Sequence, residues 1–282
     1  MRRPLVLAAL AVALLAVALV VAAALGAASH PVGALATRAP RETAMMRARV
    51  AEAASDGRRL SIDQRWVPYE RISPLLRRAV LVAEDDAFFS HGGLDWAEIG
   101  AAARRNLEAG RIVRGGSTIT QQLARNLFLG EQRTLSRKLE EAFIAVRLER
   151  ALTKRRIFEL YLNLIEWGDG IYGAEAASQR IFGMSAANLG PREAVLLAAV
   201  IINPRRYSPL DPGRRIERRV RVIAGRLKRR GDIDEQAYQL AINAPLPPAP
   251  IATTGALPGS AALPVEPGAE SESVVTAPDS LP

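Results

Sequence analysis

The stretch Arg114-Gly-Gly-Ser-Thr-Ile-Thr-Gln-Gln-Leu-Ala-Arg-Asn-Leu-Phe-Leu129 passes from a glycine pair to a row of hydroxyl and amide side chains, and then to an apolar helical run. This order suits a backbone loop that presents an anionic, sugar-rich ligand to the start of a helix. The same residues also fit a helix cap, in which Ser117 or Thr118 caps the helix and Gln121 or Gln122 closes a capping box. Both interpretations predict a loop followed by a helix.

The N-terminus carries a long apolar segment. Met1-Arg-Arg is followed by Leu5 to Leu25, which contain no charged or strongly polar residue. A helix of this length measures roughly 31 Å, close to the thickness of the hydrocarbon core of a bilayer. Arg2 and Arg3 favour a cytoplasmic N-terminus. A signal peptide cleaved within Gly26–Ser29 is the alternative, but signal segments are shorter, so we expect an uncleaved anchor.

The charge of the chain is unevenly distributed. The 282 residues carry +9 in total, and the tail from Pro245 contributes −4, so the remainder carries +13. Arginines are dense in Arg205–Arg230, which could attract nucleic acid, anionic lipid headgroups or a phosphorylated lipid, or form a solvated helix face. For an anchored chain we favour lipid. The chain has no cysteine and only His30 and His91, which excludes the usual Cys/His zinc site.

Composition divides the chain into four parts. Residues 1–29 form the anchor, and residues 30–60 form a polar and alanine-rich connector that we expect to be partly helical. Residues 61–244 are the only stretch that can build a core. Residues 245–282 hold half of the chain's 18 prolines among small residues, which predicts a disordered tail.

The core-forming part is predicted to be mainly α-helical. Apolar side chains recur every three or four positions, as on the buried face of a helix. The predicted helices are Ile72–Ala87, Trp96–Leu107, Thr134–Leu152, Ile157–Leu164 and Arg192–Ile202. No pair of alternating runs joined by a hairpin turn is convincing.

A first acidic cluster follows the first of these helices. Glu84, Asp85 and Asp86 stand where the helix is predicted to end. Acids at the C-terminal end of a helix oppose its dipole, which raises their pKa, and carboxylates of this kind are frequent at functional sites. The structural alternative is that Asp85 and Asp86 cap the turn and that His91 packs on Phe88. For His91 we favour the structural alternative.

A second cluster lies on the predicted helix from Thr134. Arg137 and Lys138 precede Glu141 by four and three positions, so all three can share one edge of the helix, although an ordinary exposed ion pair has the same spacing. No Ser-His-Asp set and no P-loop are present. Two carboxylates without a cofactor motif are typical of chemistry at a sugar anomeric carbon, and cations can hold a departing phosphate.

Five motifs resemble those of the family 51 glycosyltransferases, which polymerise lipid II into peptidoglycan. They are Glu84-Asp-x-x-Phe-x-x-His-x-Gly93, Gly115-Gly-Ser-Thr-Ile-Thr-Gln-Gln-Leu123 with Asn126, Arg137-Lys-x-x-Glu141, Lys154-x-x-Ile-x-Glu-x-Tyr-Leu-Asn163, and Glu193-Ala194 to Pro204. Each motif is moderately specific, and five in order are very hard to obtain by chance. No serine is followed three positions later by lysine, so the chain resembles the monofunctional biosynthetic form.

The resemblance implies a mainly α fold, with a lysozyme-like large lobe and a small membrane-proximal jaw lobe preceded by one transmembrane helix. It also implies that lipid II is joined to the growing glycan strand through β-1,4 bonds, with inversion at the anomeric carbon and release of undecaprenyl pyrophosphate. The expected location is the periplasmic side of the bacterial cytoplasmic (inner) membrane. Cell-wall synthesis or division proteins would be further partners, and nucleic acid would not.

The resemblance also assigns site residues. Glu84 would be the general base, and Glu141 would lie near the donor pyrophosphate, assisting its departure or coordinating a divalent ion. The implied substrate-binding residues are Ser117, Thr118, Gln122, Arg125, Arg137, Lys138 and Asn163. Arg125 replaces the lysine that is usual in the family, which keeps the charge and alters its geometry. No cofactor is required by the sequence, and Mg²⁺ or Mn²⁺ at Glu141 stays open.

Two other functions compete with this one. The first is a lysozyme-like hydrolase or lytic transglycosylase that cleaves glycan, but cleavage of a neutral glycosidic bond needs no cluster of cations. The second is a catalytically inactive scaffold of the cell-wall machinery. The presence of both Glu84 and Glu141 argues against that reading.

Overall fold

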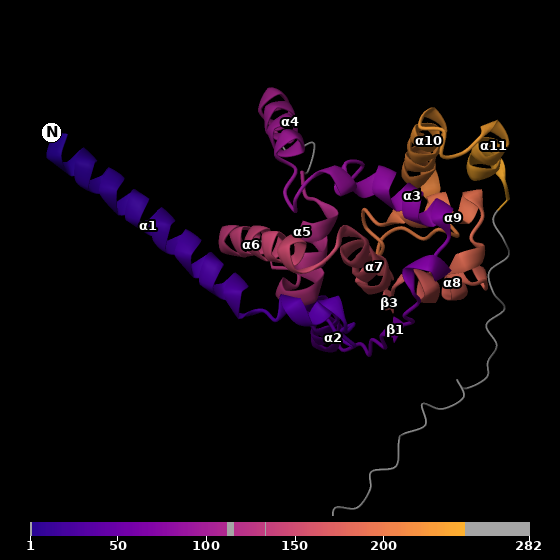
Figure 1. The fold of residues 1–282 in the computed structure, drawn as a ribbon, viewed down its shortest axis with the longest axis horizontal. Helices are drawn as coiled ribbons and strands as arrows, with labels where there is room; N and C mark the ends of the chain where they lie inside the picture. Colours follow the sequence, from indigo (N-terminus) through magenta and orange to yellow (C-terminus); the bar gives the residue numbers. More distant parts are fainter. Residues whose placement is uncertain (1, 112–115, 133, 246–282) are drawn as a thin grey trace, which may run out of the picture. The chain divides into compact units, whose positions relative to one another are not determined.

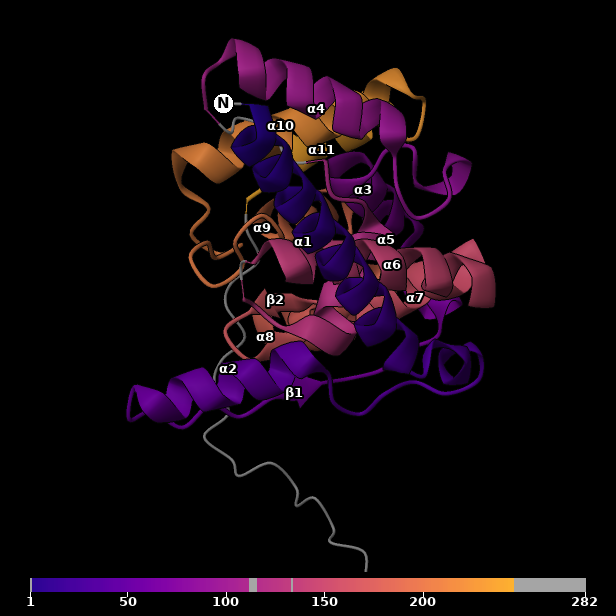
Figure 2. The same cartoon turned by 90° about the vertical axis from the view of Figure 1, so that its left-hand side faces the viewer.

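The computed structural model describes residues 2–111, 116–132 and 134–245 and is mainly helical, as predicted (Figures 1 and 2). Gly115 of the second motif and the tail 246–282, which we expect to be disordered, lie outside the described residues. The elements are α1 (Arg2–Ser29), α2 (Ala44–Ser55), β1 (Asp63–Gln64), α3 (Pro74–Glu84), α4 (Trp96–Glu108), α5 (Ile119–Ala124), η4 (Arg125–Leu129), α6 (Leu135–Ala151), α7 (Lys154–Leu164), β2 (Glu166–Gly168), β3 (Ile171–Tyr172), α8 (Ala174–Phe182), α9 (Pro191–Val200), α10 (Gly213–Arg229) and α11 (Glu235–Asn243), with short 3₁₀ turns at Val32–Ala36, Tyr69–Arg71, Phe88–Ser90 and Ala186–Asn188.

The core is built around two helices that are buried nearly all round. Every residue of α9 from Ala194 to Val200 is buried, and α3, α10 and α11 pack against it. In α7 nearly every residue from Ile157 to Leu164 is buried, and α5 packs beside it. Because these two helices are buried on nearly every side, they fix the places of the neighbouring elements that carry the polar residues.

Local capping sets where several helices begin. The hydroxyls of Thr134 and Thr153 accept hydrogen bonds from backbone N–H groups at the starts of α6 and α7, each at 3.2 Å. The helix α3 begins at Pro74 and ends at Glu84, three residues before the predicted end at Ala87. It ends there because Asp85 leaves the helical conformation, with φ −162° and ψ 81°.

A small sheet was missed by the sequence analysis. Strands β2 and β3 form an antiparallel hairpin around Gly168–Gly170, and β1 pairs in parallel with β3, giving the order β1-β3-β2. The expectation that no hairpin is present was therefore wrong. The strands have two or three residues each, which is too short for an alternation of apolar and polar side chains to be visible.

The apolar segment at the N-terminus forms α1, whose residues Arg3–Ser29 are long and apolar enough to cross a membrane, with a mean hydropathy of 3.1. The C-terminal end of α1 packs against α6. Ala23 and Ala27 are buried there, and the carbonyl of Ala27 accepts a hydrogen bond from Arg147. His30 then stacks on Phe128 at 4.6 Å. The anchor segment thus ends in direct contact with the folded part.

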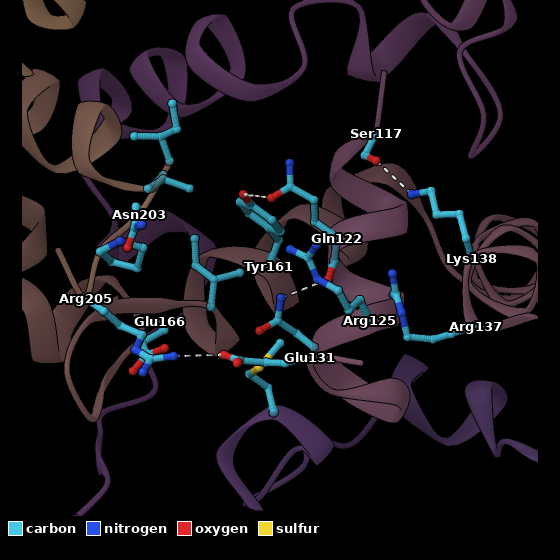
Figure 3. A pocket seen from close by; sticks show the side chains of 16 residues that line it. Ser117, Gln122, Arg125, Glu131, Arg137, Lys138, Tyr161, Glu166, Asn203 and Arg205 are labelled. Carbon is cyan, nitrogen blue, oxygen red and sulfur yellow. Dashed lines mark hydrogen bonds and ion pairs between the residues drawn. The ribbon is translucent and has the colours of Figure 1, made fainter. Parts of the chain in front are cut away.

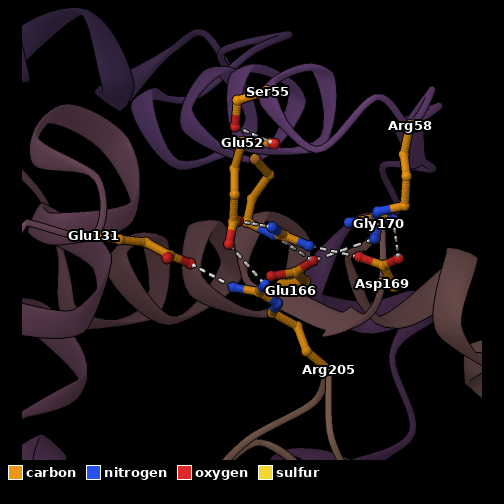
Figure 4. Close-up of polar contacts among 9 residues, drawn as sticks. Glu52, Ser55, Arg58, Glu131, Glu166, Asp169, Gly170 and Arg205 are labelled. Carbon is orange, nitrogen blue, oxygen red and sulfur yellow. Dashed lines mark hydrogen bonds and ion pairs between the residues drawn. The ribbon is translucent and has the colours of Figure 1, made fainter.

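Residues of the expected connector form α2, which is held by a fully buried arginine. The guanidinium of Arg49 donates to Asp169 Oδ1 at 2.5 Å and to Glu166 Oε1 at 3.4 Å, and it also pairs with Glu52 (Figure 4). Arg205 donates to the other oxygen of Glu52 at 2.9 Å. These ion pairs connect α2 to the β2–β3 turn and to the loop after α9.

A glycine after β3 gives the first test. Gly173 has a φ of +85°, and a Cβ there would lie 2.7 Å from the carbonyl oxygen of Asn163. Gly173→Ala is expected to lower the free energy of unfolding by about 1–3 kcal/mol more than the same substitution at a glycine that has a positive φ but open space around it. Gly231, with φ +76° and nothing near its Cβ position, is that control. Thermal unfolding of the full chain in detergent measures both, and equal losses would contradict the steric argument.

Candidate active site

Glu84 is the last residue of α3, and its side chain is only 12% exposed. It lines a cavity of about 530 Å³. Its Oε1 accepts a hydrogen bond from Arg219 Nη2 at 2.7 Å, and its Oε2 accepts one from Gln122 Nε2 at 3.0 Å. The carboxylate is therefore held from two sides by elements distant in sequence.

Burial raises the pKa of Glu84 above its ordinary value, because desolvation penalises the ionised carboxylate. The charge of Arg219, the hydrogen bond from Gln122 and the charge of Arg125 act in the opposite direction. A carboxylate with a raised pKa is a better proton acceptor than a solvated one, which suits a general base.

The amide of Gln122 is oriented by a second hydrogen bond. Tyr161 OH donates to Gln122 Oε1 at 3.0 Å, which leaves Nε2 directed at Glu84. Burial raises the pKa of Tyr161 well above its ordinary value, so its hydroxyl keeps its proton and acts as a donor. The start of α5 fixes the position of Gln122, because Thr118 and Gln121 form a capping box there.

Asp85 and His91 have structural positions. Asp85 accepts hydrogen bonds from the backbone N–H of Ile119 at 2.9 Å and from His91 Nε2 at 2.9 Å. The ring of His91 packs edge-on against Phe88, with the centroids 6.3 Å apart. The interpretation favoured for His91 from the sequence is thus confirmed. Asp86, by contrast, pairs with Arg230.

Glu141 is buried and bonds to two partly buried cations on α6. Its side chain is 1% exposed, Arg137 Nη1 donates to its Oε2 at 2.6 Å, and Lys138 bonds to its Oε1. The predicted spacing therefore gives a buried carboxylate that bonds to two cations, and not an exposed ion pair. Lys138 Nζ also donates to Ser117 Oγ at 2.8 Å. Glu140, the neighbouring acid, lies apart from this cluster and contacts His30 at 3.2 Å.

Arg137 and Lys138 line a second cavity, with a volume of about 560 Å³, together with Arg125 and Gln122 (Figure 3). Arg125 begins η4, a π-helical turn, a feature frequent at functional sites. In the described part of the chain Arg125 forms no ion pair, so its charge is available to a ligand. Arg205 also lines this cavity, but it pairs with Glu52 and Glu131. The other three cations favour an anion with several negative charges.

The two cavities adjoin, since Ser117 and Ile202 line both. A buried carboxylate thus faces one space and a cluster of cations faces the next. Figure 3 shows Arg137 and Lys138 on one side of the cationic cavity and Arg205 on the opposite side, with Gln122 and Tyr161 between them.

Two of the predicted substrate-binding residues are engaged within the fold. The Thr118 hydroxyl is buried, donates to the Gly93 carbonyl at 2.6 Å and caps α5, although the residue does line the cavity of Glu84. Asn163 is fully buried and lines neither cavity. Its side chain accepts a hydrogen bond from the backbone N–H of Val67 and donates one to the backbone carbonyl of Val67, both at 3.0 Å. The remaining predicted residues are brought together around the two spaces.

The surroundings of Glu141 do not fit a divalent metal ion. Both of its carboxylate oxygens already bond to cationic side chains, which would repel a metal. Among the described residues no group of three or more His, Asp or Glu side chains has an arrangement that could hold one. We therefore assign no step to a metal.

Sequence reasoning missed two residues of the site. Arg219 was counted only as part of the arginine-rich segment, and Tyr161 was noted only as a member of a helix and of the fourth motif, without a role in the site. The periodicity of α10 offered a signal, because Ile216, Val220 and Ile223 define a buried face and Arg219 lies beside it.

Comparison with known proteins gives the family. A family model described as Transglycosylase matches residues 53–228. A biosynthetic peptidoglycan transglycosylase from Methylobacillus flagellatus is 48% identical over 189 residues, which cover 67% of this chain and 82% of that protein. Proteins of the same name from Dechloromonas aromatica and Thiobacillus denitrificans are 47% and 50% identical, over 67% and 65% of this chain and 81% and 79% of theirs. The chain belongs to the transglycosylase family.

Proposed function

We propose that the protein is a peptidoglycan transglycosylase that polymerises lipid II during bacterial cell-wall synthesis. The observation that carries this proposal is the pair of adjoining cavities, one holding the buried carboxylate of Glu84 and the other the cations Arg125, Arg137 and Lys138. Sugar transfer from a lipid diphosphate needs both a base for the acceptor hydroxyl and positive charge for the departing diphosphate.

The proposed reaction assigns a role to each group. Glu84 removes the proton of the acceptor 4-hydroxyl, and the oxygen attacks the anomeric carbon of the growing strand from the face opposite the diphosphate. The bond between that carbon and the phosphate oxygen breaks, the configuration inverts, and a β-1,4 bond forms. The electron pair leaves with undecaprenyl pyrophosphate, whose charge Arg125, Arg137 and Lys138 neutralise. Glu141 holds Arg137 and Lys138 in place.

The proposed location follows from α1. The apolar span would cross the cytoplasmic membrane once, and Arg2 and Arg3 would keep the N-terminus in the cytoplasm. The catalytic part would then lie on the periplasmic side, where the headgroup of lipid II is displayed. The arrangement keeps the enzyme and its lipid-linked substrate at the same membrane surface.

Replacement of the base tests the proposal directly. Glu84→Gln keeps the shape of the side chain but removes its ability to accept a proton, and is expected to lower the polymerisation rate by about 10²–10⁴-fold. The measurement is polymerisation of labelled lipid II by the full-length protein in detergent, with products resolved by length. Glu140→Gln is the control, because that acid contacts His30 and lines neither cavity. Polymerisation by Glu84→Gln at a rate close to that of the wild type would refute the base assignment, and no polymer from the wild type would refute the function.

Inhibition by inorganic pyrophosphate tests the cationic cavity. Lys138→Ala removes one charge-assisted contact, so the inhibition constant of pyrophosphate is expected to rise roughly 10–100-fold. Lys228→Ala serves as the control, because Lys228 pairs with Glu235 outside both cavities. An unchanged inhibition constant in Lys138→Ala would show that the diphosphate binds elsewhere.

A further inference from the structure

We propose that Arg219 is a positioning residue that keeps Glu84 ionised and directed into its cavity, so that α10 sets the pH range in which the base operates. The inference rests on the proposed function, because it concerns the same base. It adds a residue outside the five sequence motifs, at a distance of 135 positions from Glu84.

The geometry places Arg219 at the end of α3. The helix α10 packs on α3 through a buried face that includes Ile216, Val220 and Ile223. From the edge of that face, Arg219 Nη2 donates to Glu84 Oε1 at 2.7 Å and to the carbonyl of Ala83 at 3.3 Å. One guanidinium group therefore holds both the carboxylate and the backbone that carries it.

Arg226 provides an internal comparison. It lies seven residues further along α10, and its Nη1 donates to the carbonyl of Val82 at 3.3 Å. It lines the same cavity as Glu84, but no bond between the two is among the contacts of the described residues. Both arginines satisfy carbonyls at the end of α3, and only Arg219 also bonds the base. Any effect on the ionisation of Glu84 should therefore distinguish them.

Other polar and titratable groups also face Glu84. Gln122 reaches it from α5, Arg125 acts on it from η4, and Tyr161 lies behind Gln122 on α7. Among the described residues, Arg219 is the cation that bonds the carboxylate directly.

The acids of the same cavity are Asp85, Asp86, Asp95 and Glu98. Asp85 is turned toward His91 and Ile119, and Asp86 pairs with Arg230. Asp95 caps α4 by accepting the N–H of Glu98. Burial raises the pKa of Glu84, while Arg219, Gln122 and Arg125 lower it, and the charge of Arg219 is the largest of these lowering influences.

The direction of the expected change follows from that balance. Burial raises the pKa of Glu84, and the charge of Arg219 is the first of the influences that lower it. Removing that charge leaves burial less opposed, so the pKa of Glu84 rises further. At a pH below this value the protonated acid cannot accept the proton of the acceptor hydroxyl, and the rate falls there.

The experiment is the pH dependence of kcat/KM for lipid II polymerisation by the full-length protein in detergent. In Arg219→Gln the acid limb of the profile is expected to move about one unit to higher pH, which is a tenfold loss at low pH, with a smaller loss on the plateau. Arg219→Lys retains a positive charge and should therefore move the acid limb less. Arg226→Gln should leave the acid limb where it is in the wild type. If Arg219→Gln lowered kcat/KM by the same factor at every pH, the role of Arg219 would be purely structural and the inference would be overturned.

A second measurement does not depend on activity. A carboxyl whose pKa is higher in the folded than in the unfolded protein contributes stability at low pH, and this is lost as the pH rises through the folded value. The contribution of Glu84 is the difference in melting temperature between a protein with Glu84 and the same protein with Glu84→Gln. This difference is measured against pH in the wild-type background and in the Arg219→Gln background. In the Arg219→Gln background it should fall over a wider range of rising pH. Identical ranges would overturn the inference. Failure of the wild type to polymerise lipid II would refute the proposed function alone.

Discussion

The carboxylate of Asp85 holds together the two elements on which the site depends. It lies immediately after α3 and accepts a hydrogen bond from the first backbone N–H of α5 at 2.9 Å. A carboxylate at a helix N-terminus is favoured by the helix dipole and by the free N–H groups there. Because the end of α3 and the start of α5 are joined in this way, Glu84 and Gln122 face each other at hydrogen-bonding distance. The contact between the base and Gln122 follows from this connection, and the packing of α10 on α3 adds the contact with Arg219.

The cationic cavity is subject to electrostatic repulsion among its own side chains. Arg125, Arg137 and Lys138 line one cavity and repel one another when no anion is bound. Glu141, buried on the same helix as Arg137 and Lys138, compensates part of that repulsion and fixes the two cations at the cavity wall. Arg125 stays without an ion pair among the described residues. The site is thus partly neutralised when empty, and it keeps one cation whose charge is balanced only by the ligand.

The sequence predicted what depends on neighbouring residues. The stripe in Thr134–Leu152 became α6, whose bounds are Leu135–Ala151, and the spacing of Arg137 and Glu141 gave the buried pair. Contacts across long separations could not be predicted in this way, because periodicity describes one helix and not its partner. The bond between Arg219 and Glu84 is of this kind, as is the burial of Arg49. Motif resemblance cannot tell a residue that contacts ligand from one that supports the backbone. Asn163, whose side chain bonds to the backbone of Val67 and to the carbonyl of Glu159, shows the difference.

The docking of α1 on α6 has a consequence for how the enzyme would encounter its substrate. A flexible tether would let the catalytic part sample many heights and tilts above a bilayer. Here the last turns of α1 pack against the helix that carries Arg137, Lys138 and Glu141, and His30 stacks on Phe128 beyond them. In the proposed membrane setting, enzyme and lipid-linked substrate would both diffuse laterally within one sheet, and collisions would occur at a nearly constant height. The search would be two-dimensional, and its rate would depend on membrane fluidity more than on the viscosity of the surrounding water.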